Sequence, residues 1–206
     1  YGWVDISGDG TNTGLTGDDQ NAGPFQLGFD FNFYGQTYNS IQVCSNGWAS
    51  FTSTVTTYVN TTIPAPAEPN SVIYLLWDDL YLPTGGSIVY RADADRFIIS
   101  WLDVPHINGN GTYTCQMIIN EDNSIVLQYN SVADVSSVTV GVENAAGTEA
   151  LQICANGAGT VPVANSAWLV ADAAGIPAAP TGLAANVVGT TVSLSWTDPS
   201  EDTNGN

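Results

Sequence analysis

Residues 25–51, FQLGFDFNFYGQTYNSIQVCSNGWASF, decide the fold of this chain. In the first nine residues, Phe or Leu at positions 25, 27, 29, 31 and 33 alternates with Gln, Gly, Asp and Asn. Successive side chains of a strand point to opposite faces, so this period of two predicts a strand with one continuous apolar face. Such a face needs an apolar layer opposite, so the rest of the chain is expected to supply a second sheet.

The strand pattern continues along the chain. Residues 34–37 predict a turn, residues 41–44 a returning strand, and Ser45-Asn46-Gly47 a hairpin into the strand that begins near Trp48. A short strand is expected around Trp3, and further apolar runs with hairpin spacing follow at residues 71–77, 87–90, 97–101, 112–119, 124–129, 138–142, 151–154 and 167–170. About ten short strands without helical periodicity predict an all-β fold, a two-layer antiparallel β-sandwich of jelly-roll-like type.

The run at residues 71–77 is apolar throughout, which predicts a central strand buried on both faces. Residues 52–70 are rich in Thr and then Pro and predict a surface crossing. Arg91 and Arg96 lie at the base of the predicted 86–104 hairpin, whose tip is polar.

Charge restricts the classes of partner. The chain has 20 acidic residues against two basic ones, Arg91 and Arg96, and its net charge is −18. Without a basic patch it lacks the phosphate contacts on which nucleic-acid binding depends, and an anionic membrane surface repels it. No apolar run approaches the roughly 18 residues of a membrane span, so membrane insertion is not expected. The acidity suits either bound Ca²⁺ or the soluble surface of a secreted protein.

The best match to a metal-binding pattern is residues 5–10, DISGDG. It places Asp5, Ser7 and Asp9 at the first three oxygen-ligand positions of an EF-hand loop, with Gly at position 6. The twelfth position is Thr16 instead of Glu, so the full motif fails. Two further carboxylates follow closely, and the predicted calcium ligands are therefore Asp5, Ser7, Asp9, Asp18 and Asp19, with a solvated Asp/Gly turn as the alternative.

Sequence patterns typical of catalytic sites are weaker than the metal-binding pattern. Asp78 and Asp79 follow the buried strand, and neighbouring strand residues point to opposite faces, so a glycosidase pair would need re-aiming. One of the two is expected to face inward and the other to bond a loop or join a cation site. His106 is the single histidine, no G-x-S-x-G motif is present, and a turn histidine on the surface is expected. The chain is predicted not to be an enzyme.

Three cysteines allow one disulfide. Cys115 and Cys154 lie in predicted strands of the second half and form the preferred pair, while three buried free thiols remain the alternative. Asn60 and Asn110 begin glycosylation sequons, which favour secretion.

Aromatic residues suggest a third kind of site, because an aromatic face can pair with the C–H face of a sugar. Most candidates fall inside apolar runs, where core packing is the ordinary interpretation: Trp48, Tyr74, Trp77, Trp101 and Tyr113. The loop candidates for an exposed platform are Tyr34, Tyr38, Tyr58 and Tyr81.

Residues 1–170 resemble a β-sandwich module of secreted bacterial proteins. The resemblance rests on FDFNFYGQTYNSIQVCSNGWASF, SVIYLLWDDL, SIVYRADADRFIISW and TVGVENAAGTEALQ. That module occurs beside subtilisin-like and other extracellular protease domains and in surface adhesins, and it is distantly similar to the nidogen-like extracellular domain. The resemblance implies an accessory, non-catalytic module and supplies no catalytic residue. Cys44 departs from the small polar residue or Val that related sequences generally have.

The composition changes after Ile176. Residues 177–206 resemble the opening strands of a fibronectin type III domain, with Pro180, Leu183 and Trp196 in the expected order. The predicted organisation is a sandwich module at 1–172, an Ala/Pro linker at 173–180, and the first strands of a fibronectin type III-like domain at 181–206. These strands would belong to a cut domain or pair with another chain.

The expected function is that of an extracellular, non-catalytic module for adhesion or interaction within a larger secreted or surface protein, with calcium as the expected stabilising ion. Its partner would be a protein or glycan at a cell surface or in a matrix. One alternative is a subunit of an extracellular filament or surface layer that forms homo-oligomers by strand addition through residues 191–196. A second alternative is a carbohydrate-binding module of a secreted enzyme.

Overall fold

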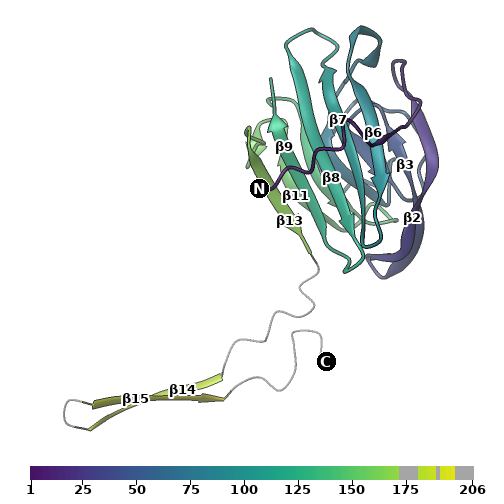
Figure 1. Cartoon of the computed structure of the whole chain (residues 1–206). Coiled ribbons are helices and arrows are strands. Elements are labelled where there is room, and N and C mark those ends of the chain that lie inside the picture. Colours follow the sequence, from purple (N-terminus) through teal and green to yellow (C-terminus); the bar gives the residue numbers. More distant parts are fainter. Residues whose placement is uncertain (172–180, 189–190, 198–206) are drawn as a thin grey trace. The chain divides into compact units, whose positions relative to one another are not determined.

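The computed structural model describes residues 1–171, 181–188 and 191–197 and separates the chain into two compact units. The first unit, Tyr1–Val170, is the sandwich in Figure 1. In the second unit, Ala171–Asn206, strands β14 (Thr181–Val188) and β15 (Thr191–Thr197) form an antiparallel two-stranded sheet. The predicted linker at 173–180 lies outside the described residues, and the assignment of the hairpin to a fibronectin type III domain stays a prediction.

Two antiparallel sheets form the first unit, which confirms the predicted all-β sandwich. Sheet A has six strands in the order β1 (Thr11–Asn12), β6 (Ser87–Ala92), β7 (Arg96–Pro105), β8 (Thr112–Asn120), β9 (Ile125–Ser131) and β13 (Ser166–Val170). Sheet B has seven strands in the order β12 (Ala158–Gly159), β11 (Ala150–Ala155), β10 (Thr139–Glu143), β5 (Val72–Trp77), β4 (Trp48–Ser50), β3 (Gln36–Cys44) and β2 (Asn21–Phe33). One 3₁₀ turn, η1 (Leu82–Thr84), follows β5.

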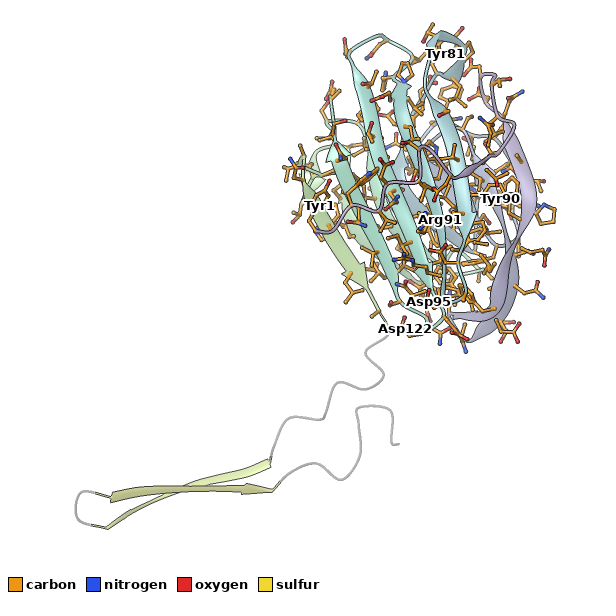
Figure 2. All side chains as sticks on the ribbon, in the orientation of Figure 1. Tyr1, Tyr81, Tyr90, Arg91, Asp95 and Asp122 are labelled. Atoms are coloured by element: carbon orange, nitrogen blue, oxygen red, sulfur yellow. The ribbon has the colours of Figure 1, made fainter. Side chains whose placement is uncertain are left out.

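The order of strands within sheet A is a meander. Strands β6, β7, β8 and β9 are consecutive in the chain and adjacent in the sheet, whereas a jelly roll is built from two Greek keys. The two predicted hairpins of this region are therefore confirmed. Strand β7 of the first hairpin pairs with strand β8 of the second. Figure 2 shows their tips, marked by Asp95 and Asp122, at the opposite end of the sandwich from Tyr81.

The alternating stretch behaves as its periodicity predicts. Along β2 the side chains of Leu27, Phe31 and Phe33 are buried in the main core, and those of Phe25 and Phe29 pack against it. Phe51, the last residue of the stretch, completes the aromatic cluster, with ring centroids 5.4 Å from Phe31 and 5.0 Å from Phe33. Burying each large apolar side chain contributes about 1.5–3 kcal/mol.

Strand β5 is the buried central strand that its sequence predicts, and it lies between β10 and β4. Its outer face is covered by residues 52–70, so this segment is a structural cover and more than a surface crossing. The carbonyl of Thr57 accepts bonds from the indoles of Trp48 (3.2 Å) and Trp77 (3.1 Å). Under the same cover, the fully buried carboxyl group of Glu143 accepts a 2.7 Å bond from the Ala65 amide, and burial raises its pKa.

The outer face of sheet A has a different cover, which we call the N-terminal strap (residues 1–10). Figure 1 shows it running across β9, β8, β7 and β6. It forms no strand at Trp3, where one was predicted, because its backbone bonds to side chains. The amide of Gly2 donates to Gln128 Oε1 at 3.1 Å, and the carbonyl of Val4 accepts from Gln116 Nε2 at 2.8 Å. Ile6 is buried in a small cluster on the sheet.

The three cysteines are buried free thiols in the structure. The preferred Cys115–Cys154 disulfide is therefore not formed, and the alternative of free thiols describes the molecule. Cys115 lies on β8 and Cys154 on β11, which belong to different sheets. Burial raises the pKa of Cys44 to about 12 and that of Cys154 to about 11, so these thiols stay protonated at neutral pH.

Both arginines lie at the base of the β6–β7 hairpin, as predicted, and each forms an ion pair there. Arg91 contacts Asp93 at 2.9 Å and Asp9 of the strap at 3.0 Å, and Arg96 contacts Asp93 at 2.9 Å. Hydrogen bonds from Arg91 and then Arg96 lower the pKa of Asp93. The arginines thus tie the strap to the hairpin and leave the rest of the surface acidic.

The turn between β3 and β4 depends on Gly47. Its φ is +77°, and a Cβ built there would lie 1.9 Å from the carbonyl oxygen of Leu76. Gly35 has a similar φ of +74° but open space around the position of a Cβ. A substitution at Gly35 therefore introduces backbone strain alone, whereas a substitution at Gly47 introduces strain and steric overlap together.

We expect Gly35→Ala to lower the free energy of unfolding by about 1–2 kcal/mol through backbone strain alone. Gly47→Ala should cost about 4 kcal/mol or more, because strain and overlap with a buried backbone act together. Urea unfolding followed by tryptophan fluorescence measures both. Equal losses in the two variants would contradict the described turn.

Candidate functional site

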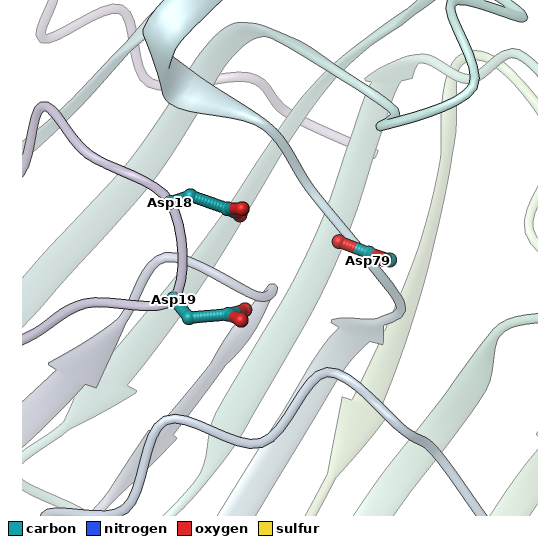
Figure 3. Close-up of side chains that lie close together, drawn as sticks. All are labelled: Asp18, Asp19 and Asp79. Carbon is teal, nitrogen blue, oxygen red and sulfur yellow. The ribbon is translucent and has the colours of Figure 1, made fainter.

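Three carboxylates gather at one end of the sandwich. Asp18 and Asp19 lie in the loop between β1 and β2, and Asp79 follows β5. Figure 3 shows the three side chains pointing toward one another, and one oxygen from each lies within 4.8 Å of the others. Asp18 is exposed and the other two are half-buried.

The turn before β4 helps to position this acidic cluster. The fully buried side chain of Asn46 donates from Nδ2 to Asp19 Oδ1 at 2.7 Å. Its Oδ1 accepts from the amide of Leu80 at 3.1 Å, just after Asp79. Asn46 therefore connects the two loops that carry the three carboxylates.

Electrostatics disfavour the charged form of one member of the acidic cluster, Asp79. Burial raises the pKa of Asp79, and the charges of Asp19 and then Asp18 raise it further. Carboxylate oxygens are the ligands that Ca²⁺ prefers, and six to eight oxygens are needed, so carbonyl groups or water would complete a shell. The geometry thus brings three carboxylates together, and calcium binding by them stays a prediction.

The predicted calcium ligands do not form one group. Asp18 and Asp19 belong to the acidic cluster, whereas Asp5 Oδ1 accepts a 2.9 Å bond from the Ser7 amide in a local turn. Asp9 is the ion-pair partner of Arg91. Residues 5–10 thus contain a hydrogen bond typical of the Asp/Gly turn that was the alternative, and calcium binding by them stays a prediction. Asp79, which was outside the predicted set, lies beside Asp18 and Asp19. The pattern Asp78-Asp79 after a buried strand was the signal for it.

Asp78 points inward, into a buried group at the same end. Its Oδ2 accepts from Ser137 Oγ at 2.6 Å and lies 3.3 Å from His106 Nε2. His106 is 9% exposed, so the prediction of a surface histidine is wrong. The amide of Asn108 donates to His106 Nδ1 at 3.2 Å, which leaves the ring proton on Nε2, facing Asp78. The serine bonds the acid instead of the histidine, which differs from a catalytic triad.

Most of the aromatic candidates for sugar stacking are core residues. Those inside the strands are buried: Trp48, Tyr74, Trp77, Trp101 and Tyr113. Tyr34 and Tyr58 are 40% and 44% exposed, and Tyr38 and Tyr81 are half-buried. Trp3 is also partly exposed, and the sequence offered no reason to single it out.

The two sequon asparagines have different surroundings. Asn60 Nδ2 donates to Thr139 Oγ1 at 2.9 Å and to the carbonyl of Ser137, so a glycan there would displace structural bonds. Asn110 is exposed in the loop that follows β7. Glycosylation of either residue stays a prediction.

A family model described as NIDO related matches residues 2–184. The chain belongs to the NIDO-related family. Domains of this family are typically extracellular, and the match begins in the N-terminal strap and ends within β14. Searches of curated proteins and of solved structures gave no match. Within the described part of this NIDO-related chain, no helix has the length and apolar character needed to cross a bilayer.

The raised pKa of Asp79 predicts a pH-dependent contribution to the free energy of unfolding of the chelator-treated protein. A raised folded pKa means that this group favours folding below its unfolded pKa, near 3.8, and that the benefit is lost as pH rises through the folded pKa. Asp79→Asn should therefore raise the free energy of unfolding at pH 7 by about 0.5 kcal/mol after solvent screening. At about pH 3 the difference should vanish.

Urea unfolding at both pH values measures this effect, with Asp30→Asn as the control. Asp30 is an exposed strand residue outside the acidic cluster, so Asp30→Asn removes the same charge from the chain without changing the cluster. Equal changes in the two variants would mean that neither burial nor the neighbouring charges raise the pKa of Asp79.

Proposed function

We propose that this chain is a non-catalytic binding module of a larger secreted or surface protein, with a protein or glycan at a cell surface or in a matrix as its partner. The observation that carries the proposal is the NIDO-related match over residues 2–184, which puts the sandwich in an extracellular family. The net charge of −18 is consistent with a soluble exterior module.

The non-catalytic part of the proposal has support in the arrangement of His106. Its Nε2 faces Asp78, and its Nδ1 is occupied by a backbone amide. Both nitrogens serve loop structure, so neither is available to take a proton from a nucleophile. Ser137 likewise donates to Asp78.

The direct test applies the fluorescently labelled 206-residue chain to intact cells and to isolated extracellular matrix. We expect saturable retention that excess unlabelled chain removes, together with no turnover of ester, peptide or glycoside substrates. Turnover that disappears in His106→Asn would contradict the proposal, as would retention that never saturates.

Calcium stabilisation is part of the proposal, with Asp18, Asp19 and Asp79 as the ligands from this chain. A cation would favour the charged form of Asp79, which burial and then the charges of Asp19 and Asp18 disfavour. At a calcium concentration 100 times Kd, binding should stabilise the fold by about 2.7 kcal/mol. Melting of chelator-treated protein with and without Ca²⁺ measures this. The gain should be lost in Asp79→Asn and kept in Asp5→Asn, and an unchanged melting temperature in the parent chain would remove the calcium clause.

Self-assembly by strand addition is a second candidate function. Strands β14 and β15 form a sheet of only two strands, and such a hairpin is at best marginal in water without further pairing. Its edges could add to a sheet of another copy. Light scattering should show large assemblies for the 206-residue chain and smaller ones after removal of residues 177–206. An unchanged oligomer size would rule this candidate out.

A further inference from the structure

Beside the N-terminal strap, the outer face of sheet A contains a broad hollow of about 660 Å³. Its floor comes from the adjoining strands β6, β7, β8 and β9, and one wall comes from the strap. The lining residues that matter chemically are Trp3, Asp5, Asp103, Thr114, Asn130 and Ser131. This volume lies within the usual range for small-molecule sites.

The strap holds Trp3 at the wall of this hollow. On either side of Trp3, the backbone is bonded to sheet A, through Gly2 to Gln128 and through Val4 to Gln116. Val4 and Ile6 turn toward the sheet, while Trp3 and Asp5 turn toward the hollow. The backbone that carries the partly exposed indole is therefore fixed before any ligand arrives, which lowers the entropic cost of binding.

A bulge in β7 places Asp103 in the hollow. Trp101 and Val104 are both buried in the main core although they are three residues apart, which a regular strand with period two cannot achieve. The ladder to β8 shifts register between them, and Asp103 has a φ of +51°. Bulges commonly re-aim a side chain, and here the irregularity turns a carboxylate outward.

Several polar groups of the hollow have bonding capacity to spare. Thr114 Oγ1 donates to Asp103 Oδ1 at 2.9 Å and accepts from its amide at 3.0 Å, which orients the carboxylate. Within residues 1–171, Asp103 Oδ2 and the side chains of Asn130 and Ser131 make no hydrogen bond to another residue. A ligand with many hydroxyl groups would satisfy such a mixture of donors and acceptors.

The surroundings of the hollow restrict the class of ligand. Asp5 and Asp103 line it without any Lys or Arg, so anions are repelled. Strands β6 to β9 are paired on both edges, so a peptide cannot bind here by strand addition. The aromatic wall suits the C–H face of a sugar ring.

We propose that this hollow binds a neutral saccharide, with Trp3 stacking against a sugar ring and with Asp103 and Asn130 bonding its hydroxyl groups. The inference rests on the proposed function, because it names a glycan as the partner of the binding module. It also gives the N-terminal strap a role beyond covering the sheet.

The experiment uses the 206-residue chain on an array of neutral oligosaccharides built from glucose, galactose, mannose, xylose and N-acetylhexosamines. Matched glycans that carry uronic or sialic acid are printed beside them. Isothermal titration with the strongest soluble oligosaccharide then measures the affinity. We expect binding to a neutral class and none to its acidic counterparts.

Variants place the binding in the hollow. Trp3→Ala should weaken binding about tenfold or more, and Trp3→Phe should keep it within about threefold, because the stacking face is retained. Asp103→Asn should weaken it about fivefold or more by removing a charged acceptor, while keeping a residue that tolerates a positive φ. The controls Tyr58→Ala and Asp30→Asn, an exposed aromatic and an exposed acid elsewhere, should leave the affinity unchanged.

Melting temperatures confirm that each variant is folded. If Trp3→Ala does not fold, Trp3→Phe and Asp103→Asn still test whether the saccharide binds in the hollow. No binding to any neutral glycan would overturn the inference, as would binding that Trp3→Ala and Asp103→Asn leave intact or binding restricted to acidic glycans. Saturable retention on cells by a chain that binds no glycan would overturn this inference and leave the proposed binding function standing.

Discussion

The outer face of sheet A is organised by one buried amide, the side chain of Gln116. It is fully buried, and a buried amide that lacks partners would cost roughly 1–3 kcal/mol. Its Nε2 donates to Val4 and Ser100, and its Oε1 accepts from Val4 and Gln128, so its full bonding capacity is used. The path of the N-terminal strap meets this requirement, since the backbone of Val4 supplies both a donor and an acceptor.

The outer faces of the two sheets are covered in different ways. Sheet B has an apolar outer face around Trp48 and Trp77, and residues 52–70 cover it with carbonyl groups that the indoles bond. Sheet A has polar residues on its outer face, and the narrow strap crosses it and leaves hollows beside it. The covered apolar region around Trp48 and Trp77 and the partly covered face of sheet A thus have separate roles, one in stability and one in presenting polar groups to solvent.

Local periodicity accounts for most of what the sequence predicts correctly. The alternation at residues 25–33 and the apolar run at 71–77 each specify a strand and its buried faces without knowledge of distant contacts. His106 and Trp3 were misjudged because their surroundings come from residues far away in the chain, Asp78 for the histidine and Gln116 for the strap. Two of the three carboxylates of the acidic cluster were predicted, since Asp18 and Asp19 are adjacent in sequence whereas Asp79 joins them only through the fold.

Amide hydrogen exchange at Val4 shows whether the strap is a fixed part of the sandwich. The Val4 amide donates to Gln116 Oε1 at 3.4 Å, while Gly8 lies in the exposed turn of the same strap. If the strap is held as described, Val4 should exchange about a hundredfold more slowly than Gly8 after correction for intrinsic rates, since exchange requires the strap to open. Equal corrected rates at the two amides would mean that the strap is not held, and the account of the outer face would be wrong.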